Sequence, residues 1–152
     1  MRLQYILNRL VFSAAALLTA AVAPAHAQKL VSINAETVNM RAAPSPRGEV
    51  LWKLGSGYPL KIVDRKGSWL QVVDFEGDRG WVASRLTSST PYYIVKAPRA
   101  NLRAGPGTGY RIVGAAVYGE TFRVLDKRKA WVRVKGEGQR KGWIARGLLW
   151  GW

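Results

Sequence analysis

Apolar and polar residues alternate in short segments along most of this chain, and the alternation predicts β-strands. In residues 36–41, Val38 and Met40 are separated by a polar residue, so both fall on one face of an extended strand. The same pattern predicts strands at residues 50–54, 60–62, 69–73 and 80–82. In the strand at 69–73, Leu70 and Val72 are expected to point inward. Short strands with no helical periodicity favour a small antiparallel β-barrel.

Clusters of Gly, Pro, Ser and Asp predict the connections between these strands. They occur at residues 42–48, 55–57, 64–67 and 76–78. Residues 30–34, ahead of the first strand, are expected to form an extended arm.

The whole pattern occurs twice, at a constant offset of 62 residues and without a gap. Equivalent residues include Asn39 and Asn101, Asp64 and Asp126, Trp69 and Trp131, Val72 and Val134, and Leu86 and Leu148. Val50, Trp52 and Leu54 alternate in the first copy, and Ile112 and Ala116 take the places of Val50 and Leu54 in the second. A slip of one residue would turn every side chain to the wrong face, so the ungapped offset indicates one shared fold with shared core positions.

The N-terminal segment has the features of a secretory signal peptide. Arg2 and Arg9 are followed by an uncharged run over residues 10–22, and residues 25–27 read Ala-His-Ala, a small-x-small cleavage site. The run is shorter than the roughly 20 residues that span a bilayer, which disfavours an uncleaved anchor. We therefore expect residues 1–27 to be removed and the mature chain to have no transmembrane span.

The remaining chain is expected to form two domains, at residues 28–88 and 89–152. The polar segment 87–91 reads as the linker between them, and residues 150–152 match no element of the pattern.

The composition excludes several kinds of chemistry. The chain has no Cys, and its one His, His26, lies in the predicted leader. Thiol catalysis, Cys-ligated zinc and imidazole chemistry are therefore excluded from the mature protein. The few carboxylates lie mostly in turn-like segments such as 74–78, which disfavours a hydrolase with paired acids. We expect no catalytic residues, no metal site and no cofactor. Export without disulfides fits a bacterial periplasm or envelope.

The positive charge is concentrated in the second copy. The full chain carries +15. Residues 29–88 contain nine Lys and Arg against six Asp and Glu, giving +3, whereas residues 89–152 contain thirteen against three, giving +10. Such charge serves solubility or an anionic partner, and export weighs against nucleic acid as that partner. Trp131 and Arg133 share a strand face, which suits an acidic, partly apolar ligand; a solvated basic surface explains the same residues.

Several motifs resemble those of bacterial SH3-like (Src-homology-3-like) domains. The second copy carries Asn-Leu-Arg-Ala-Gly-Pro at 101–106, Gly-Trp-Ile at 142–144 and a closing Leu148. The first copy departs from the pattern, because Ala43 stands in place of Gly105 and Gly48 in place of Tyr110, so we expect a differently shaped loop there. The resemblance implies an all-β protein of two tandem SH3-like barrels. It also implies non-catalytic binding of peptidoglycan or peptide-like ligands.

Two interpretations remain for the residues singled out by these motifs. Arg41 and Arg103, beside the Pro loop, either donate to loop carbonyls or clamp a carboxylate of a wall peptide. Four Trp residues fall out of phase with the inward positions and either pack or line a groove, with packing favoured for Trp81 and Trp143. The candidate ligand-binding residues are Arg41, Trp69, Trp81, Arg103, Tyr110, Tyr118, Lys129, Trp131, Arg133 and Trp143, with Tyr110 and Tyr118 at the rim of one groove.

The sequence thus predicts a periplasmic or secreted binding module. Its expected partner is peptidoglycan or a wall-associated peptide. The alternatives are a protein–protein adaptor in the periplasm and electrostatic attachment to anionic envelope polymers.

Overall fold

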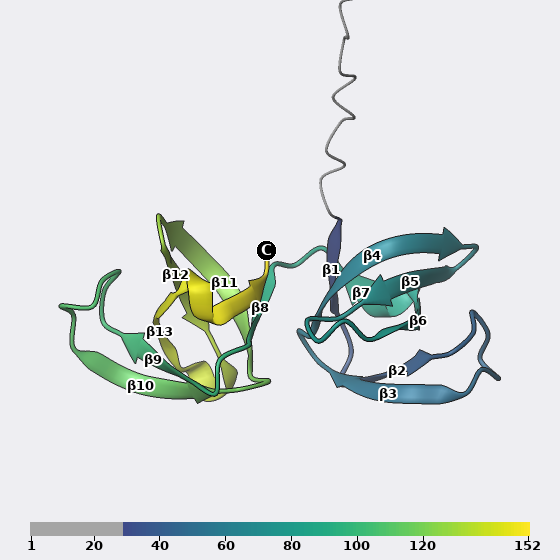
Figure 1. The fold of residues 1–152 in the computed structure, drawn as a ribbon, viewed down its shortest axis with the longest axis horizontal. Helices are drawn as coiled ribbons and strands as arrows, with labels where there is room; N and C mark the ends of the chain where they lie inside the picture. Colours follow the sequence, from purple (N-terminus) through teal and green to yellow (C-terminus); the bar gives the residue numbers. More distant parts are fainter. Residues whose placement is uncertain (1–28) are drawn as a thin grey trace, which may run out of the picture.

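The structure, a computed structural model, describes residues 29–152 and consists of two β-barrels (Figure 1). The signal peptide predicted for residues 1–27 lies outside the described residues. The first barrel contains β1 (Leu30–Ile33), β2 (Thr37–Arg41), β3 (Val50–Gly55), β4 (Pro59–Lys66), β5 (Trp69–Val73), β6 (Arg79–Ala83), the 3₁₀ turn η1 (Ser84–Leu86) and β7 (Thr87–Ser88). Its antiparallel sheet has the strand order β3-β2-β6-β5-β4-β1-β7.

The second barrel repeats this architecture. It contains β8 (Tyr92–Val95), β9 (Arg99–Arg103), β10 (Ile112–Val117), β11 (Thr121–Arg128), β12 (Trp131–Lys135), η2 (Glu137–Gln139), β13 (Lys141–Ala145), η3 (Arg146–Leu148) and β14 (Leu149–Gly151). The strand order is β10-β9-β13-β12-β11-β8-β14, and each strand begins 62 residues after its counterpart. The predicted all-β fold of two tandem barrels is confirmed.

Each barrel has its own apolar core. Met40 and Val72 are fully buried in the first core, and Leu102 and Val134 are buried in the second. The inward positions predicted from alternation on β2 and β5 are therefore confirmed. The barrels are small, so these buried side chains carry much of the stability of each one.

The strand that contains Val50 differs from the prediction. Val50 and Trp52 are 40% and 55% exposed, and Ile112 in the equivalent strand is 54% exposed. Only Leu54 and Ala116 of these apolar positions reach a core. The reason is that β3 and β10 are edge strands, each paired with a single neighbour, so nothing covers their first residues.

The sheet pairing also corrects four predicted features outside the main strands. The turn expected at 64–67 starts later, because β4 continues to Lys66 and the chain reverses at Gly67, whose φ of +57° suits glycine. The arm at 30–34 and the first linker residues are strands β1 and β7, which pair with each other. Residues 150–152 do have a counterpart, since β14 pairs with β8 as β7 pairs with β1.

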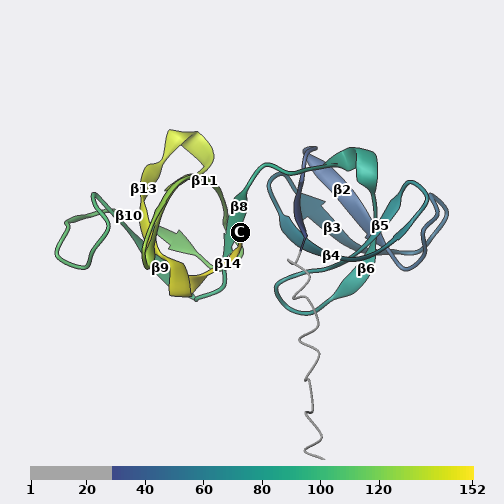
Figure 2. The same cartoon turned by 90° about the horizontal axis from the view of Figure 1, so that it is seen from above.

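The two barrels contact each other directly. The strands β8 and β14 lie on the side of the second barrel that faces β4 of the first (Figure 2). Thr121 Oγ1 donates a hydrogen bond to the Ser56 carbonyl at 3.3 Å. Gly57 packs against the Tyr92 ring so closely that a Cβ there would lie 2.5 Å from a ring carbon, so the contact requires glycine. No helix among residues 29–152 is long and apolar enough to cross a membrane.

Candidate functional site

The two motif arginines hold the loop that joins β2 to β3 and the equivalent loop that joins β9 to β10. Arg41 Nη1 donates to the Gly48 carbonyl at 2.7 Å. Arg103 Nη1 donates to the equivalent carbonyl of Tyr110 at 2.8 Å and to that of Thr108 at 2.9 Å. These bonds agree with the structural interpretation of both residues. A guanidinium has five donors, so Nη1 can hold the loop while other N–H groups remain for a ligand.

The two loops have the same backbone hydrogen bonds despite their different sequences. Ser45 N donates to the Ala43 carbonyl at 2.8 Å, and Gly107 N donates to the Gly105 carbonyl at 3.0 Å. The different loop shape expected for the first copy is therefore not found.

Two differences between the copies compensate each other and explain why the two loops have the same shape. The first copy has Ala43 and Gly48 where the second has Gly105 and Tyr110. The Tyr110 ring covers Gly105 so closely that a Cβ at Gly105 would lie 2.4 Å from a ring carbon. In the first barrel the methyl group of Ala43 stands where glycine is needed in the second, and Gly48 supplies no ring to collide with it. Tyr110 therefore packs on its own loop while remaining about half exposed.

A groove of about 460 Å³ lies on the outer side of the first barrel. It is bounded by β2, the start of β5, and the η1 turn, and it brings together Arg41 and Trp69 from the predicted set. Its other lining residues are Thr37, Val38, Asn39, Pro46, Ser68, Ala83, Arg85 and Leu86. The repeated motif pointed to Asn39, which recurs as Asn101, but no sequence pattern pointed to Arg85.

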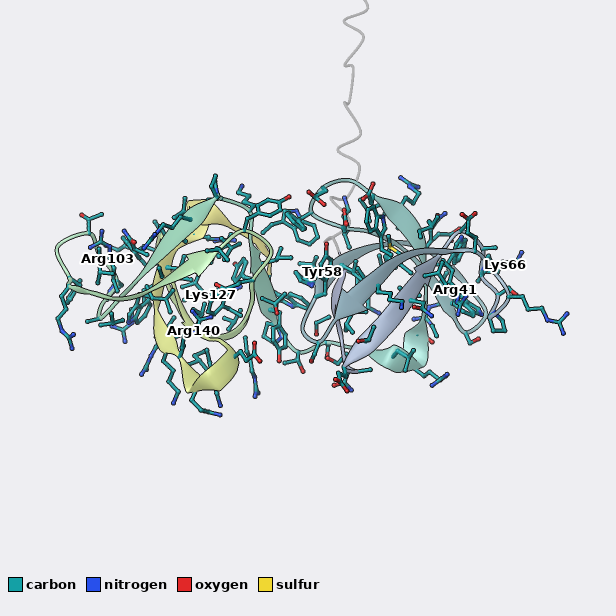
Figure 3. The ribbon with its side chains drawn as sticks, turned by 90° about the horizontal axis from the view of Figure 1, so that it is seen from below. Arg41, Tyr58, Lys66, Arg103, Lys127 and Arg140 are labelled. Carbon is teal, nitrogen blue, oxygen red and sulfur yellow. The ribbon has the colours of Figure 1, made fainter. Side chains whose placement is uncertain are left out.

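The second barrel has the same two key side chains in the equivalent place. Arg103 and Trp131 stand 62 residues after Arg41 and Trp69, on matching strands. Figure 3 shows Arg41 and Arg103 at opposite ends of the molecule. The two groups of residues therefore cannot join into one site and are two separate candidate positions.

The outer face of the second sheet carries the predicted combination of Trp and basic residues. Across β9, β13, β12 and β11 the register aligns Arg103, Trp143, Arg133 and Asp126 in one row. Trp131 lies on the same strand face as Arg133, as predicted. The Arg128 guanidinium lies 5.7 Å from the Trp143 ring centroid, and Trp143 is only 8% exposed, so it packs under basic residues.

The corresponding row of the first barrel differs at one position. It aligns Arg41, Trp81, Gln71 and Asp64, so Gln71 replaces Arg133. Trp81 is partly buried beside Arg41 and does not line the groove. Part of the additional positive charge of the second barrel therefore lies on this outer face.

Lys129 lies in the turn between β11 and β12 with its side chain exposed. Its φ is +53°, in the left-handed region, and its equivalent in the first barrel is Gly67. A residue with a Cβ costs about 1–2 kcal/mol in this conformation. The second barrel therefore has a cation at the turn before Trp131, and this residue lowers the stability of the turn relative to glycine.

Tyr118 does not share a groove with Tyr110. The two residues flank opposite ends of β10, and the Tyr118 hydroxyl donates to the Glu76 carboxylate of the first barrel. That hydrogen bond raises the pKa of Tyr118 above its ordinary value. The Tyr118 and Phe75 ring centroids are 5.4 Å apart. Tyr118 is thus a contact residue between barrels, a role that alternation along one strand could not indicate.

Three carboxylates cluster in the turn between β5 and β6. Asp74, Glu76 and Asp78 have ligand atoms within 4.8 Å of one another. Asp74 Oδ1 accepts the backbone N–H groups of Glu76 and Asp78, both at 2.9 Å, so this oxygen already shapes the turn. The Tyr58 hydroxyl donates to Asp74 Oδ2 at 3.3 Å, and burial raises the pKa of Tyr58. Figure 3 shows Tyr58 on the side of its barrel that faces the second.

Comparison with protein families identifies both barrels. Two families, each described as a bacterial SH3 domain, match residues 34–89 and residues 98–149. The chain therefore belongs to the bacterial SH3 domain proteins and carries two such domains in tandem. The resemblance inferred from the sequence motifs is confirmed.

The similar proteins are much longer than this chain. A Bacillus subtilis protein named "Putative N-acetylmuramoyl-L-alanine amidase YrvJ" is 25% identical over 130 residues, which are 78% of this chain and 25% of that protein. A Staphylococcus epidermidis protein named "Probable cell wall amidase LytH" is 35% identical over 53 residues, covering 34% of this chain and 18% of that protein. The solved structure of NlpC2 from Trichomonas vaginalis aligns with a TM-score of 0.38 at 15% identity, covering 81% of this chain and 48% of that one.

Proposed function

We propose that this chain is an exported, non-catalytic binding protein of the bacterial cell envelope whose ligand is peptidoglycan or a wall-associated peptide. In this proposal residues 1–27 are a cleaved signal peptide, and residues 28–88 and 89–152 are the two binding domains. The mature protein is periplasmic or secreted.

The observation that carries this proposal is the groove that contains Arg41 and Trp69, with Arg103 and Trp131 in the equivalent place. An aromatic ring offers a flat apolar surface to a peptide or sugar ring, and a guanidinium offers paired donors to a carboxylate. A groove of about 460 Å³ falls within the range of ordinary ligand sites. Two such positions at opposite ends suit a polymer with repeated binding units, because bivalent attachment raises avidity.

Two further facts support a binding role without catalysis. The chain has no Cys and no His after residue 26, so cysteine and histidine chemistry is missing from both barrels. Its similarity to the two amidases covers only a quarter or less of those proteins. The comparison supports a wall-related ligand, because one relative is named a probable cell wall amidase and the other a putative N-acetylmuramoyl-L-alanine amidase.

A sedimentation assay with purified, protein-free cell wall tests the proposal. The double variant Trp69→Ala, Trp131→Ala is expected to lose most of its wall binding. Trp52→Ala is the matched control, since Trp52 is an exposed Trp outside the groove and should bind as the wild type does. Circular dichroism checks that each variant is folded.

Three outcomes would count against the proposal. If the double variant sediments like the wild type, the groove is not the binding site. If the wild type itself does not sediment with protein-free cell wall, the function as a protein–protein adaptor in the periplasm is favoured instead. If only salt concentration, and neither Trp, affects sedimentation, the protein attaches electrostatically to anionic polymers.

A further inference from the structure

A second cleft, of about 690 Å³, lies between the two barrels and is larger than the groove. Glu36 and Ser56 of the first barrel form one side, and Arg123, Lys135 and Glu137 of the second barrel form the other, with Tyr92 between them. Neither barrel makes this cleft alone. Its volume falls within the range of pockets that bind small molecules and short peptides.

Contacts between the barrels fix the two sides of the cleft relative to each other. The Thr121 hydroxyl, which lines the cleft, donates to the Ser56 carbonyl at 3.3 Å, and Ser56 lines it too. Gly57 packs on the ring of Tyr92, the residue between the two sides. A site that is already formed binds a ligand without first ordering its parts.

One pair of charges in the cleft is already used by the fold. Arg140 Nη2 lies 2.8 Å from Glu120 Oε1, and Arg140 Nη1 donates to the Ala115 carbonyl at 2.9 Å. The Arg140 guanidinium also lies 5.6 Å from the Phe122 ring centroid. These three contacts make Arg140 and Glu120 part of the wall.

Four other charges in the cleft form no ion pair with any residue in 29–152. Arg123 and Lys135 are direct cross-strand partners on β11 and β12, so two cations stand side by side. Glu36 and Glu137 are the free carboxylates, and Glu36 comes from the opposite barrel. The lining thus holds three acids and three bases in a protein that is strongly basic overall.

We propose that this cleft binds a short zwitterionic peptide across the two barrels. The peptide carboxylate lies against Arg123 and Lys135, where two neighbouring cations attract it, and the peptide ammonium lies against Glu36. A polyanion is disfavoured, because the two carboxylates outside the ion pair, Glu36 and Glu137, would repel it. This site is separate from the groove, since none of its lining residues belongs to the groove.

Titration calorimetry of the purified chain with the tetrapeptide Ala-Gly-Gly-Ala tests the proposal. The peptide with free termini should bind, and capping either terminus, by N-acetylation or C-amidation, should weaken binding at least about tenfold, because each cap removes one charge-assisted contact. Glu36→Gln and Arg123→Gln should each give a similar loss. Glu49→Gln is the matched control, because Glu49 is an exposed carboxylate of the first barrel outside the cleft, and it should bind normally.

Sedimentation of Glu36→Gln with cell wall separates the two sources of such peptides. If the variant loses tetrapeptide binding but still sediments, the ligand is a soluble peptide; if it loses both, the termini are those of peptides attached to the wall. The proposal is overturned if the free tetrapeptide does not bind, if capped peptides bind as tightly, or if both cleft variants behave like Glu49→Gln. None of these results depends on whether the Trp69→Ala, Trp131→Ala variant binds the wall.

Discussion

The two barrels of this chain share every strand at one constant offset, yet their outer surfaces have diverged. In the row across the outer sheet face, Gln71 of the first barrel becomes Arg133 of the second, while the flanking Arg, Trp and Asp are kept. Two residues further along the strand, on the same face, Val73 becomes Lys135. The buried positions Val72 and Val134, next to these residues, are identical. The fold constrains the inner face by packing and leaves the outer face free to take up charge.

The turns show a second difference between the barrels. Gly67 and Gly77 of the first barrel have positive φ, and the residues at the same positions in the second are Lys129 and Gln139, with φ values of +53° and +64°. The second barrel therefore keeps the left-handed turn geometry without glycine. Side chains tolerate this conformation at a cost in free energy, so Lys129 is a candidate for a residue retained for its charge.

The prediction with the greatest effect on stability compares the two cores. Val72→Ala or Val134→Ala should lower the free energy of unfolding by about 1–4 kcal/mol, because each removes buried methyl groups and leaves a cavity. Both side chains are fully buried, so the two losses should be similar. Thermal denaturation measures the change, and a wild-type melting temperature in both variants would show that these positions do not support the cores.

The next prediction exchanges the outer faces. Arg133→Gln with Lys135→Val should weaken retention on anionic cell-wall polymer, and Gln71→Arg with Val73→Lys should strengthen it, each by several-fold at low salt. Both effects should fade as the screening length falls from about 10 Å at 0.1 M salt to about 3 Å at 1 M. Salt elution from immobilised wall polymer provides the measurement. Equal retention of the two double variants would mean that the charge of the second barrel serves solubility alone.

A smaller effect is expected at the left-handed turn. Lys129→Gly should raise the stability by about 1 kcal/mol, because glycine adopts this conformation without a Cβ penalty. Gly67→Ala should lower it by a similar amount at the same position of the first barrel. Urea denaturation compares the two variants. A destabilised Lys129→Gly variant would indicate that the Lys129 side chain makes a stabilising contact.

The smallest effect concerns the contact between barrels. Tyr118→Phe removes the hydrogen bond to Glu76 but keeps the ring beside Phe75, so the barrels should tumble slightly more independently in NMR relaxation. The pKa of Tyr118 is raised in the folded protein by this hydrogen bond, so the bond contributes fully below the ordinary Tyr pKa of about 10 and is lost as the pH rises through the raised pKa of the folded state. If the wild type and Tyr118→Phe give the same NMR relaxation at neutral pH, the hydrogen bond does not hold the barrels together.

The repeat, most strand positions and the inward residues of the central strands could be predicted from the sequence alone. It also predicted that Trp131 and Arg133 share a face, because alternation is a local property of extended backbone and the register confirms it. The repeat strengthened each of these predictions, because both copies show the same pattern at equivalent positions and must form the same fold.

Which apolar positions are covered, and which surfaces meet, depends on the packing of the whole chain. Val50 and Trp52 alternate like core residues, yet they are exposed because β3 has a neighbour on one side only. Tyr118 contacts Glu76, 42 residues away in the sequence, and Glu36 and Arg123 line one cleft because the barrels dock. Sheet edges and contacts between domains depend on how distant segments pack, and that information is not contained in the pattern of any single strand.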